Sequence, residues 1–260
     1  MGLTLHYRLT APEGCSARHA AALVRRLHAI ARDWLAQGRV LAVDDIMTDR
    51  TFLDRFGTAW RTLPHPADPE TSVGVPIRPV AGWIFPVDFG ADCEWFWLGL
   101  CRYPATVVVG GRNRATRLGE RWQFAHSCKT QYASLRGWEN FVRCHVGAVE
   151  LLGEWRRLGG RAKIDDEGGY WPRRDLAALR QRLDQMNGIV AALAGAMKDA
   201  TEGEGGAPVQ APIFAHPQFE RLEAEGAADR AANLAAAAKI IAALPRNRDR
   251  TRGDQPKTGD

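Results

Sequence analysis

The sequence predicts an α+β fold in which a mixed or antiparallel sheet is covered by helices. Short segments that alternate between apolar and polar residues have the period of a half-buried strand, and longer segments repeat their apolar residues at the spacing of a helix face. Hydrophobic residues make up 45% and charged residues 25% of the 260 residues. A chain of this length and composition buries a core without needing disulfides or metals.

The beginning of the chain predicts a strand, a helix and a second strand. Residues 3–9 alternate strictly between apolar and polar side chains, which is typical of a strand with one buried face. Residues 20–35 carry apolar side chains at helical spacing, with Ser16 as the N-cap and Gly38 as the stop. Residues 40–46, VLAVDDI, then predict a second strand that is buried until it reaches its acidic end.

The next part of the chain has weaker patterns. A short helical piece is expected over residues 52–60, followed by a loop with prolines at 64, 66, 69, 76 and 79, which exclude a regular central strand wherever they fall. Residues 80–109 predict two or three strands whose aromatic side chains fill the core; a ligand-stacking platform is the alternative.

Gly110 and Gly111 follow a run of valines. Neither a GxGxxG nor a GxxxxGK[ST] pattern accompanies them, so we expect a hairpin or loop turn that exposes Arg112, Arg114 and Arg117 rather than a phosphate-binding loop.

The second half predicts a strand over 122–132, a helix over 138–158, a strand that ends at 165–167 and an amphipathic helix over 176–197. We expect one α+β domain over 1–200, a flexible linker over 201–216, a helical segment over 217–244 and a disordered tail over 245–260.

An internal duplication is suggested by an offset of 121 residues. This shift superposes Trp34 on Trp155 and Gly38 on Gly159, and it lays Leu5 and Tyr7 on two polar residues of the later unit. The pattern predicts two pseudo-symmetric strand–helix–strand halves, possible ferredoxin-like units. Since the later unit carries polar groups where the earlier one is apolar, we expect a ligand there.

The candidate site therefore lies between 122 and 171. As catalytic residues we predict His126, Asp165 and Glu167, because carboxylates at a strand end serve as general acid or base. A divalent metal held by Asp165, Asp166 and Glu167 is possible; a solvated turn is the alternative. The expected ligand-binding residues are Cys128, Lys129, Gln131, Asn140, Arg143, Asp166 and Tyr170.

Two further arrangements in this region use its histidines and cysteines. His126, Cys128, Cys144 and His145 are competent zinc ligands, but their spacing fits no standard zinc pattern. A Cys128 nucleophile activated by a histidine is chemically sensible, whereas a buried, inert thiol is the simpler expectation.

These observations lead to two hypotheses about function. The first is a pocket that binds a small polar or anionic ligand, in a hydrolase or transferase if the protein is an enzyme. The second is a non-catalytic interaction module that uses the 176–197 helix, with the polar cluster as an internal network. The five cysteines without a CxxC pair, and the absence of a signal peptide or long apolar run, predict a cytoplasmic protein without a membrane partner. The net charge of +5 permits nucleic acid but does not indicate it.

Overall fold

A computed structural model describes residues 3–64, 71–119, 121–202 and 210–228. It confirms an α+β fold built on an antiparallel six-stranded sheet. The strands lie in the order β10 (Arg161–Asp166), β1 (Thr4–Thr10), β9 (Gln123–Lys129), β6 (Phe96–Arg102), β5 (Ala81–Asp88) and β2 (Ala42–Val43).

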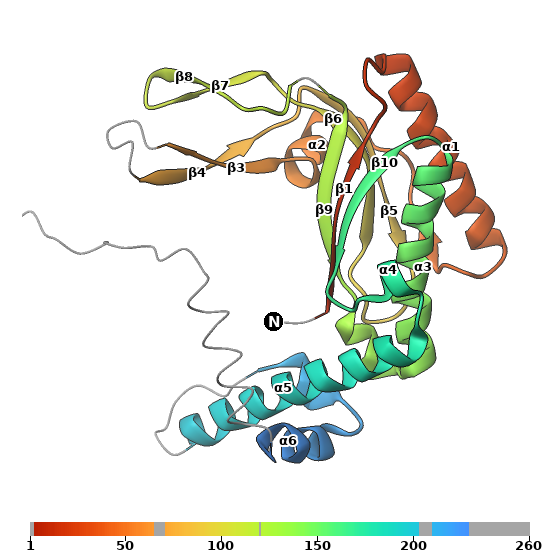
Figure 1. Cartoon of the computed structure of the whole chain (residues 1–260), viewed down its shortest axis with the longest axis vertical. Helices are drawn as coiled ribbons and strands as arrows, with labels where there is room; N and C mark the ends of the chain where they lie inside the picture. The colour runs from red at the N-terminus through yellow and green to blue at the C-terminus, as the bar shows by residue number, and fades with distance from the viewer. Residues whose placement is uncertain (1–2, 65–70, 120, 203–209, 229–260) are drawn as a thin grey trace, which may run out of the picture.

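One face of the sheet is covered by two long helices, α1 (Ala17–Ala36) and α3 (Trp138–Arg157) (Figure 1). Their apolar faces enclose the main core together with the inward side chains of the strands. Phe85, Phe89 and Phe96 are fully buried there, so these aromatic residues serve packing, as predicted.

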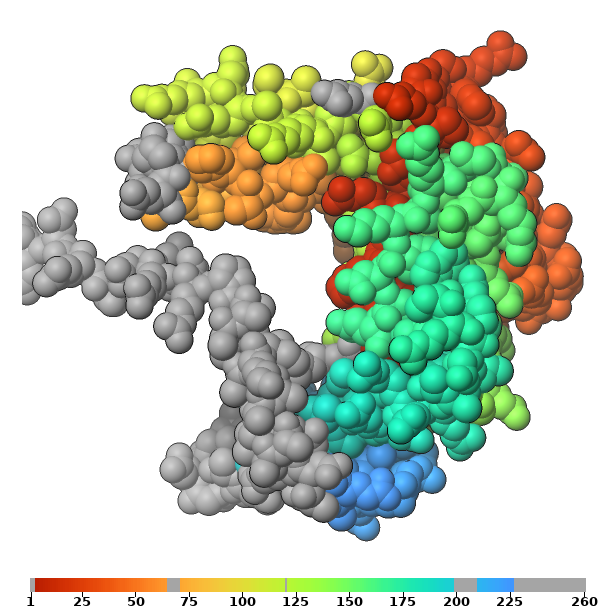
Figure 2. Space-filling model, in the orientation of Figure 1, coloured from red at the N-terminus to blue at the C-terminus, as the bar shows by residue number. Residues whose placement is uncertain are grey.

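The other face is covered only in part. The short helix α2 (Arg50–Phe56) packs on β5 through Leu53, next to Ile84. Two hairpins, β3–β4 (Ala59–Pro64 and Ser72–Ile77) and β7–β8 (Thr106–Val109 and Arg112–Ala115), project from this side. Figure 2 shows the resulting hollow, bounded by the hairpins, the sheet and the C-terminal helices. The face of β10, β1 and β9 lines it.

Several local predictions are corrected. The predicted strand over 40–46 contains only Ala42–Val43 in regular pairing, because β2 is an edge strand that pairs with the end of β5 alone. The helical piece expected over 52–60 ends at Phe56, and Trp60 lies in β3. The proline-rich loop includes the β3–β4 hairpin. This hairpin stands outside the main sheet, where a missing N–H donor is tolerated.

The turn between β7 and β8 is the hairpin turn predicted from its two glycines. Gly110 and Gly111 have φ values of 54° and 75°, which side chains with a Cβ rarely adopt but a two-residue turn requires. Val107 of β7 packs in the same apolar cluster as Val75 of β4. Both hairpins therefore pack on one apolar cluster.

The C-terminal part is more ordered than predicted. The helix α5 (Leu176–Glu202) packs against α6 (Phe219–Ala228). The predicted linker over 201–216 contains the end of α5 and a 3₁₀ turn, η2 (Pro212–Ala215), whose Ile213 is 1% exposed. Burial of this side chain holds the segment in place. The rest of the predicted 217–244 helix and the predicted tail lie outside the described residues.

The predicted duplication is not confirmed. The units β1–α1–β2 and β9–α3–β10 both exist, and His6 pairs with Ser127 across β1 and β9, which matches the offset of 121. However, β10 pairs with β1, whereas β6 and β5 separate β9 from β2. The sheet is thus not divided into two equal ferredoxin-like halves.

Candidate functional site

The polar residues at the end of β9 and the middle of α3 form a closed internal network. The Thr130 hydroxyl lies 2.8 Å from Nδ1 of His145, and Nε2 of His145 lies 3.2 Å from Oδ1 of Asp166. The latter pair is close enough for charge attraction but is not aligned as a hydrogen bond. The side chains of His145 and Asp166 are 0% and 1% exposed, so no substrate reaches this hydroxyl, imidazole and carboxylate.

Asp166 holds the turn that follows β10. Its two carboxylate oxygens accept hydrogen bonds from the backbone N–H groups of Gly168, at 2.8 Å, and Trp171, at 2.7 Å. Burial alone would raise the pKa of Asp166, but the contact with His145 and these two N–H donors outweigh it, so the pKa lies below its ordinary value. Asp166 is therefore a charged structural anchor rather than a ligand-binding group.

A second closed network surrounds Gln131 in η1 (Gln131–Arg136). Its side-chain oxygen accepts the Leu3 N–H at 3.1 Å, and its amide donates to Asn187 of α5 at 2.8 Å. Asn187 in turn donates to the Ser134 hydroxyl. Gln131 is 1% exposed. Gln131 is used internally, as Asp166 is, since buried polar groups must satisfy one another, and its predicted ligand-binding role gains no support from these contacts.

Other predicted ligand-binding residues are also used internally. The Cys128 thiol is fully buried and donates to the Glu94 carbonyl at 3.3 Å, which leaves it neither accessible nor paired with a base. Asn140 donates to the carbonyls of Ala91 and Ala133 and accepts from Arg143 at 2.7 Å. Asn140 thus ties the β5–β6 connection to the start of α3.

The last two predicted ligand-binding residues, Tyr170 and Lys129, have separate surroundings. Tyr170 is 9% exposed and stands edge-on to His145, at a centroid distance of 6.4 Å, so it fills the core rather than the mouth of a pocket. The Lys129 ammonium lies over the Tyr132 ring at 5.4 Å. The predicted pocket between β9, α3 and the 165–171 turn is therefore filled by its own side chains.

The three consecutive acids do not converge. Asp166 points into the core, whereas Asp165 is exposed on the uncovered face, because successive strand residues alternate. Glu167 accepts the Thr4 N–H at 2.8 Å and lies 3.8 Å from His6. Within the described residues no three histidine, cysteine or acidic side chains are placed to hold a metal ion, and this includes both the acidic trio and the possible zinc set.

Two of the predicted catalytic residues do share a hollow, on the uncovered face of the sheet. His126 and Asp165 both line a shallow depression of about 470 Å³, together with His6, Arg8 and Lys163. Nδ1 of His126 donates to the Ser127 carbonyl at 2.7 Å. Burial lowers the pKa of His126 more than the neighbouring Ser127 carbonyl and Glu94 raise it, so this imidazole is neutral at pH 7.

A second depression adjoins the first, and Arg8 lines both. It has a volume of about 240 Å³ and lies where the hairpins leave the sheet. Its lining comes from β1, β3, β9 and the β8–β9 connection: Arg8, Thr10, Arg61, Arg117, Arg121 and Gln123. The sequence pattern placed Arg8 on the polar face of its strand and predicted exposure of Arg117, but it did not show that they converge with Arg61 and Arg121.

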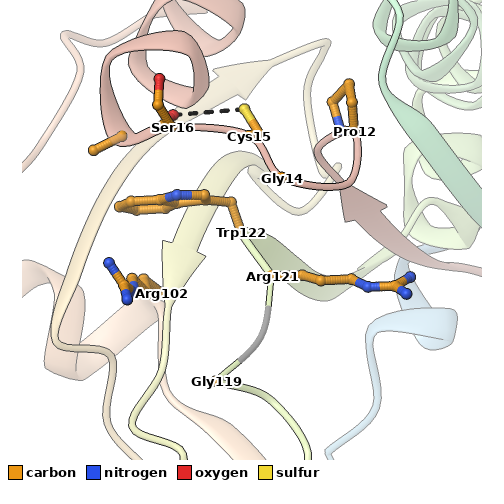
Figure 3. A pocket seen from close by; sticks show the side chains of 9 residues that line it. Pro12, Gly14, Cys15, Ser16, Arg102, Gly119, Arg121 and Trp122 are labelled. Atoms are coloured by element: carbon orange, nitrogen blue, oxygen red, sulfur yellow. Dashed lines mark hydrogen bonds between the residues drawn. The ribbon is translucent and has the colours of Figure 1, made fainter.

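Arg121 also borders a third hollow, which lies at the start of α1. Figure 3 shows this smaller hollow of about 230 Å³ lined by Arg102, Trp122 and the Cys15–Ser16 turn. There the Arg121 side chain extends away from Trp122. The guanidinium of Arg121 lies 3.9 Å from the exposed Glu13 carboxylate, a weak surface contact.

Two arginines near the hairpins carry unsatisfied donors. The Nε groups of Arg61 and Arg114 are buried and have no hydrogen-bond partner among the described residues. A buried donor without an acceptor costs about 1–3 kcal/mol.

The predicted interaction surface on α5 is covered in part. Leu179 and Leu183 are buried in the main core, whereas Leu176 and Leu193 are 45% and 44% exposed. Ala191 and Ala194, between the apolar positions, pack with Leu222 of α6. The helix is thus chiefly an internal packing element, and its use as an interface stays a prediction.

Comparison of the chain with protein-family models, with curated proteins and with solved structures finds no match. Within the described part of the chain, none of the helices combines the length and apolar composition needed to cross a bilayer.

Proposed function

We propose that this protein binds an anionic, phosphate-bearing ligand on the uncovered face of its sheet. One observation carries the proposal: cationic side chains from distant parts of the chain line two adjoining hollows, where Asp165 is the lone acid in the lining. The cations are Arg8, Arg61, Arg117, Arg121 and Lys163.

The clustering of these charges is costly without a counter-charge. Like charges in one cleft repel, and a concave wall of low dielectric constant strengthens their field. Guanidinium groups also present a planar fork of donors that matches the oxygens of a phosphate. A phosphate-bearing ligand would relieve the repulsion between these cations. The geometry therefore supports the anionic ligand of the first sequence-based hypothesis, at a different place from the one predicted.

Binding, rather than a reaction, is the function that these contacts support. The buried Thr130, His145 and Asp166 are inaccessible. On the uncovered face, His126 and Asp165 line the same hollow, and they are the groups that a hydrolytic or transfer reaction would use. Neither a hydrogen bond nor an ion pair joins these two described side chains, and Nδ1 of His126 is occupied by the Ser127 carbonyl, which favours ligand binding as the primary role.

The test uses inorganic polyphosphate, which carries charge without any other recognition group, and measures its binding by isothermal titration calorimetry. The triple variant Arg8→Gln, Arg61→Gln, Arg121→Gln removes three cations from the hollows. If each exposed contact contributes about 0.5 kcal/mol, the dissociation constant rises about tenfold.

The matched control removes the same charge from the opposite side of the molecule. Arg18→Gln, Arg25→Gln and Arg26→Gln lie on the exposed side of α1, which covers the other face of the sheet. This variant is expected to bind polyphosphate nearly as well as the wild type. Equal weakening in both triple variants, or no binding by the wild type, would refute the proposal.

A further inference from the structure

We infer that the anionic ligand is a single-stranded nucleic acid that lies along the uncovered sheet face and meets the β3–β4 hairpin; this inference rests on the proposed anion binding. Its first support is the extent of the basic surface. The cations run from Lys163 on β10, through Arg8 on β1, to Arg61 on β3. A small phosphate needs donors that meet at one point, whereas a polymer with phosphates at intervals needs a row of them.

The depression that Arg8 and Lys163 line lies on the uncovered sheet face, which forms the wall of a larger hollow that is open on one side. Figure 2 shows it between the hairpins and the C-terminal helices, with the sheet as its wall. The depression around His126 and Asp165 is shallow rather than enclosed. A chain can therefore enter from the side and leave again without threading.

An exposed aromatic side chain on the hairpin supplies the second support. Trp60 of β3 is 70% exposed, the highest exposure among the large hydrophobic residues that are exposed in the described structure. Two carbons of its indole, Cε3 and Cζ3, would lie 3.8 and 4.0 Å from a Cβ added at Gly74 of β4, so the ring lies beside the second strand of the hairpin. Most of the side chain stays open to a planar partner.

Trp60 lies on the exposed face of the β3–β4 hairpin. Trp60 and Arg61 alternate along β3, and the face that carries Val75 packs on the apolar cluster to which Ile77 belongs. Arg61 pairs with Val75 and therefore shares that face, whereas Trp60 projects from the opposite one. In Figures 1 and 2 the β3–β4 hairpin borders the hollow.

The combination of cations and a free indole distinguishes nucleic acid from other anions. Bases of a single strand stack on aromatic rings while the phosphates follow a basic groove. In a duplex the bases are already stacked on each other and their faces are not available to Trp60. An acidic peptide would use the cations but would gain little from the indole.

The experiment compares single-stranded oligonucleotides with polyphosphate, a duplex and polyglutamate by fluorescence anisotropy and competition. The probes are fluorescein-labelled thymidine and uridine oligonucleotides of equal length, with inorganic polyphosphate as the competitor without bases. The wild type is expected to bind at least one single strand more tightly than polyphosphate. Trp60→Ala should weaken oligonucleotide binding about 5- to 150-fold and leave polyphosphate binding unchanged, and Trp60→Phe should restore part of the loss.

Two controls separate stacking from charge. Trp95→Ala removes another exposed tryptophan, in the β5–β6 connection outside both hollows, and should leave oligonucleotide binding unchanged. Arg8→Gln should weaken both ligands, and the slope of log Kd against log salt for the oligonucleotide should fall by about 0.7.

The outcomes keep the two proposals apart. Binding of polyphosphate with no preference for a single strand, or with no effect of Trp60→Ala, overturns the nucleic-acid inference and leaves anion binding standing. Equal affinity for a duplex or for polyglutamate overturns it as well. Failure of every polyanion to bind refutes anion binding itself, and the inference with it.

Discussion

The buried carboxylate of Asp166 offers the sharpest test of how this fold is held together. Asp166→Ala removes the acceptor of two backbone N–H groups and the carboxylate beside His145. The side chains of Asp166 and His145 are at most 1% exposed. A buried donor left without an acceptor costs about 1–3 kcal/mol, and Asp166→Ala leaves two of them. We therefore expect the free energy of unfolding to fall by about 2–6 kcal/mol, and Tm to fall by about 4–24 °C.

The assay is urea denaturation followed by tryptophan fluorescence, together with thermal unfolding. Asp165→Ala is the matched control, because the adjacent residue has the same side chain but is exposed on the other face of β10. It should change the free energy of unfolding by less than about 0.5 kcal/mol. The reasoning is refuted if Asp166→Ala costs no more than Asp165→Ala.

The remaining predictions concern pH and two glycines. The pKa of Asp166 is lowered on folding, so its contribution to the free energy of unfolding is complete above the unfolded pKa of about 3.9 and is lost as the pH falls through the folded pKa. Urea titrations at successive pH values should therefore show a difference in stability between the wild type and Asp166→Asn that is constant near pH 7 and shrinks below about pH 4. Gly226→Ala should destabilise the α5–α6 contact, because an added Cβ would overlap the Gly188 carbonyl oxygen; faster proteolysis within α5 and α6 would show this, and an unchanged digestion pattern would contradict it. Gly153→Ala in α3, where an added Cβ meets nothing within 4 Å, should instead raise the free energy of unfolding by about 0.5–1 kcal/mol, and a loss of stability in urea denaturation would contradict that expectation.

Much of the fold follows from local patterns. The alternation of residues 3–9 is that of β1, with its apolar positions buried and His6 and Arg8 exposed. The two long helices over 17–36 and 138–157 match their predicted positions closely. The valine run and its two glycines gave the β7–β8 hairpin. Each of these depends on a periodicity that a single segment displays by itself.

The residues of the candidate site could be predicted from the sequence only in part. The sequence indicated that Asp165 and His126 belong to one region, and the structure places both on one hollow. It also grouped Asp166 and Gln131 with them, although these side chains are buried in internal networks. A polar residue that binds a ligand and one that satisfies a buried neighbour look alike in a sequence. Only the surrounding contacts separate the two.

The sequence by itself determined which side chains each strand and helix presents to the core and which to solvent, because backbone geometry fixes those alternations within a segment. The tertiary structure decided which exposed side chains become neighbours. Arg8, Arg61 and Arg121 lie far apart in the chain and meet because β1 pairs with β9 and the β3–β4 hairpin projects in front of them. Strand order and hairpin placement arise from the packing of the whole chain. A local sequence pattern therefore does not predict where this basic surface forms.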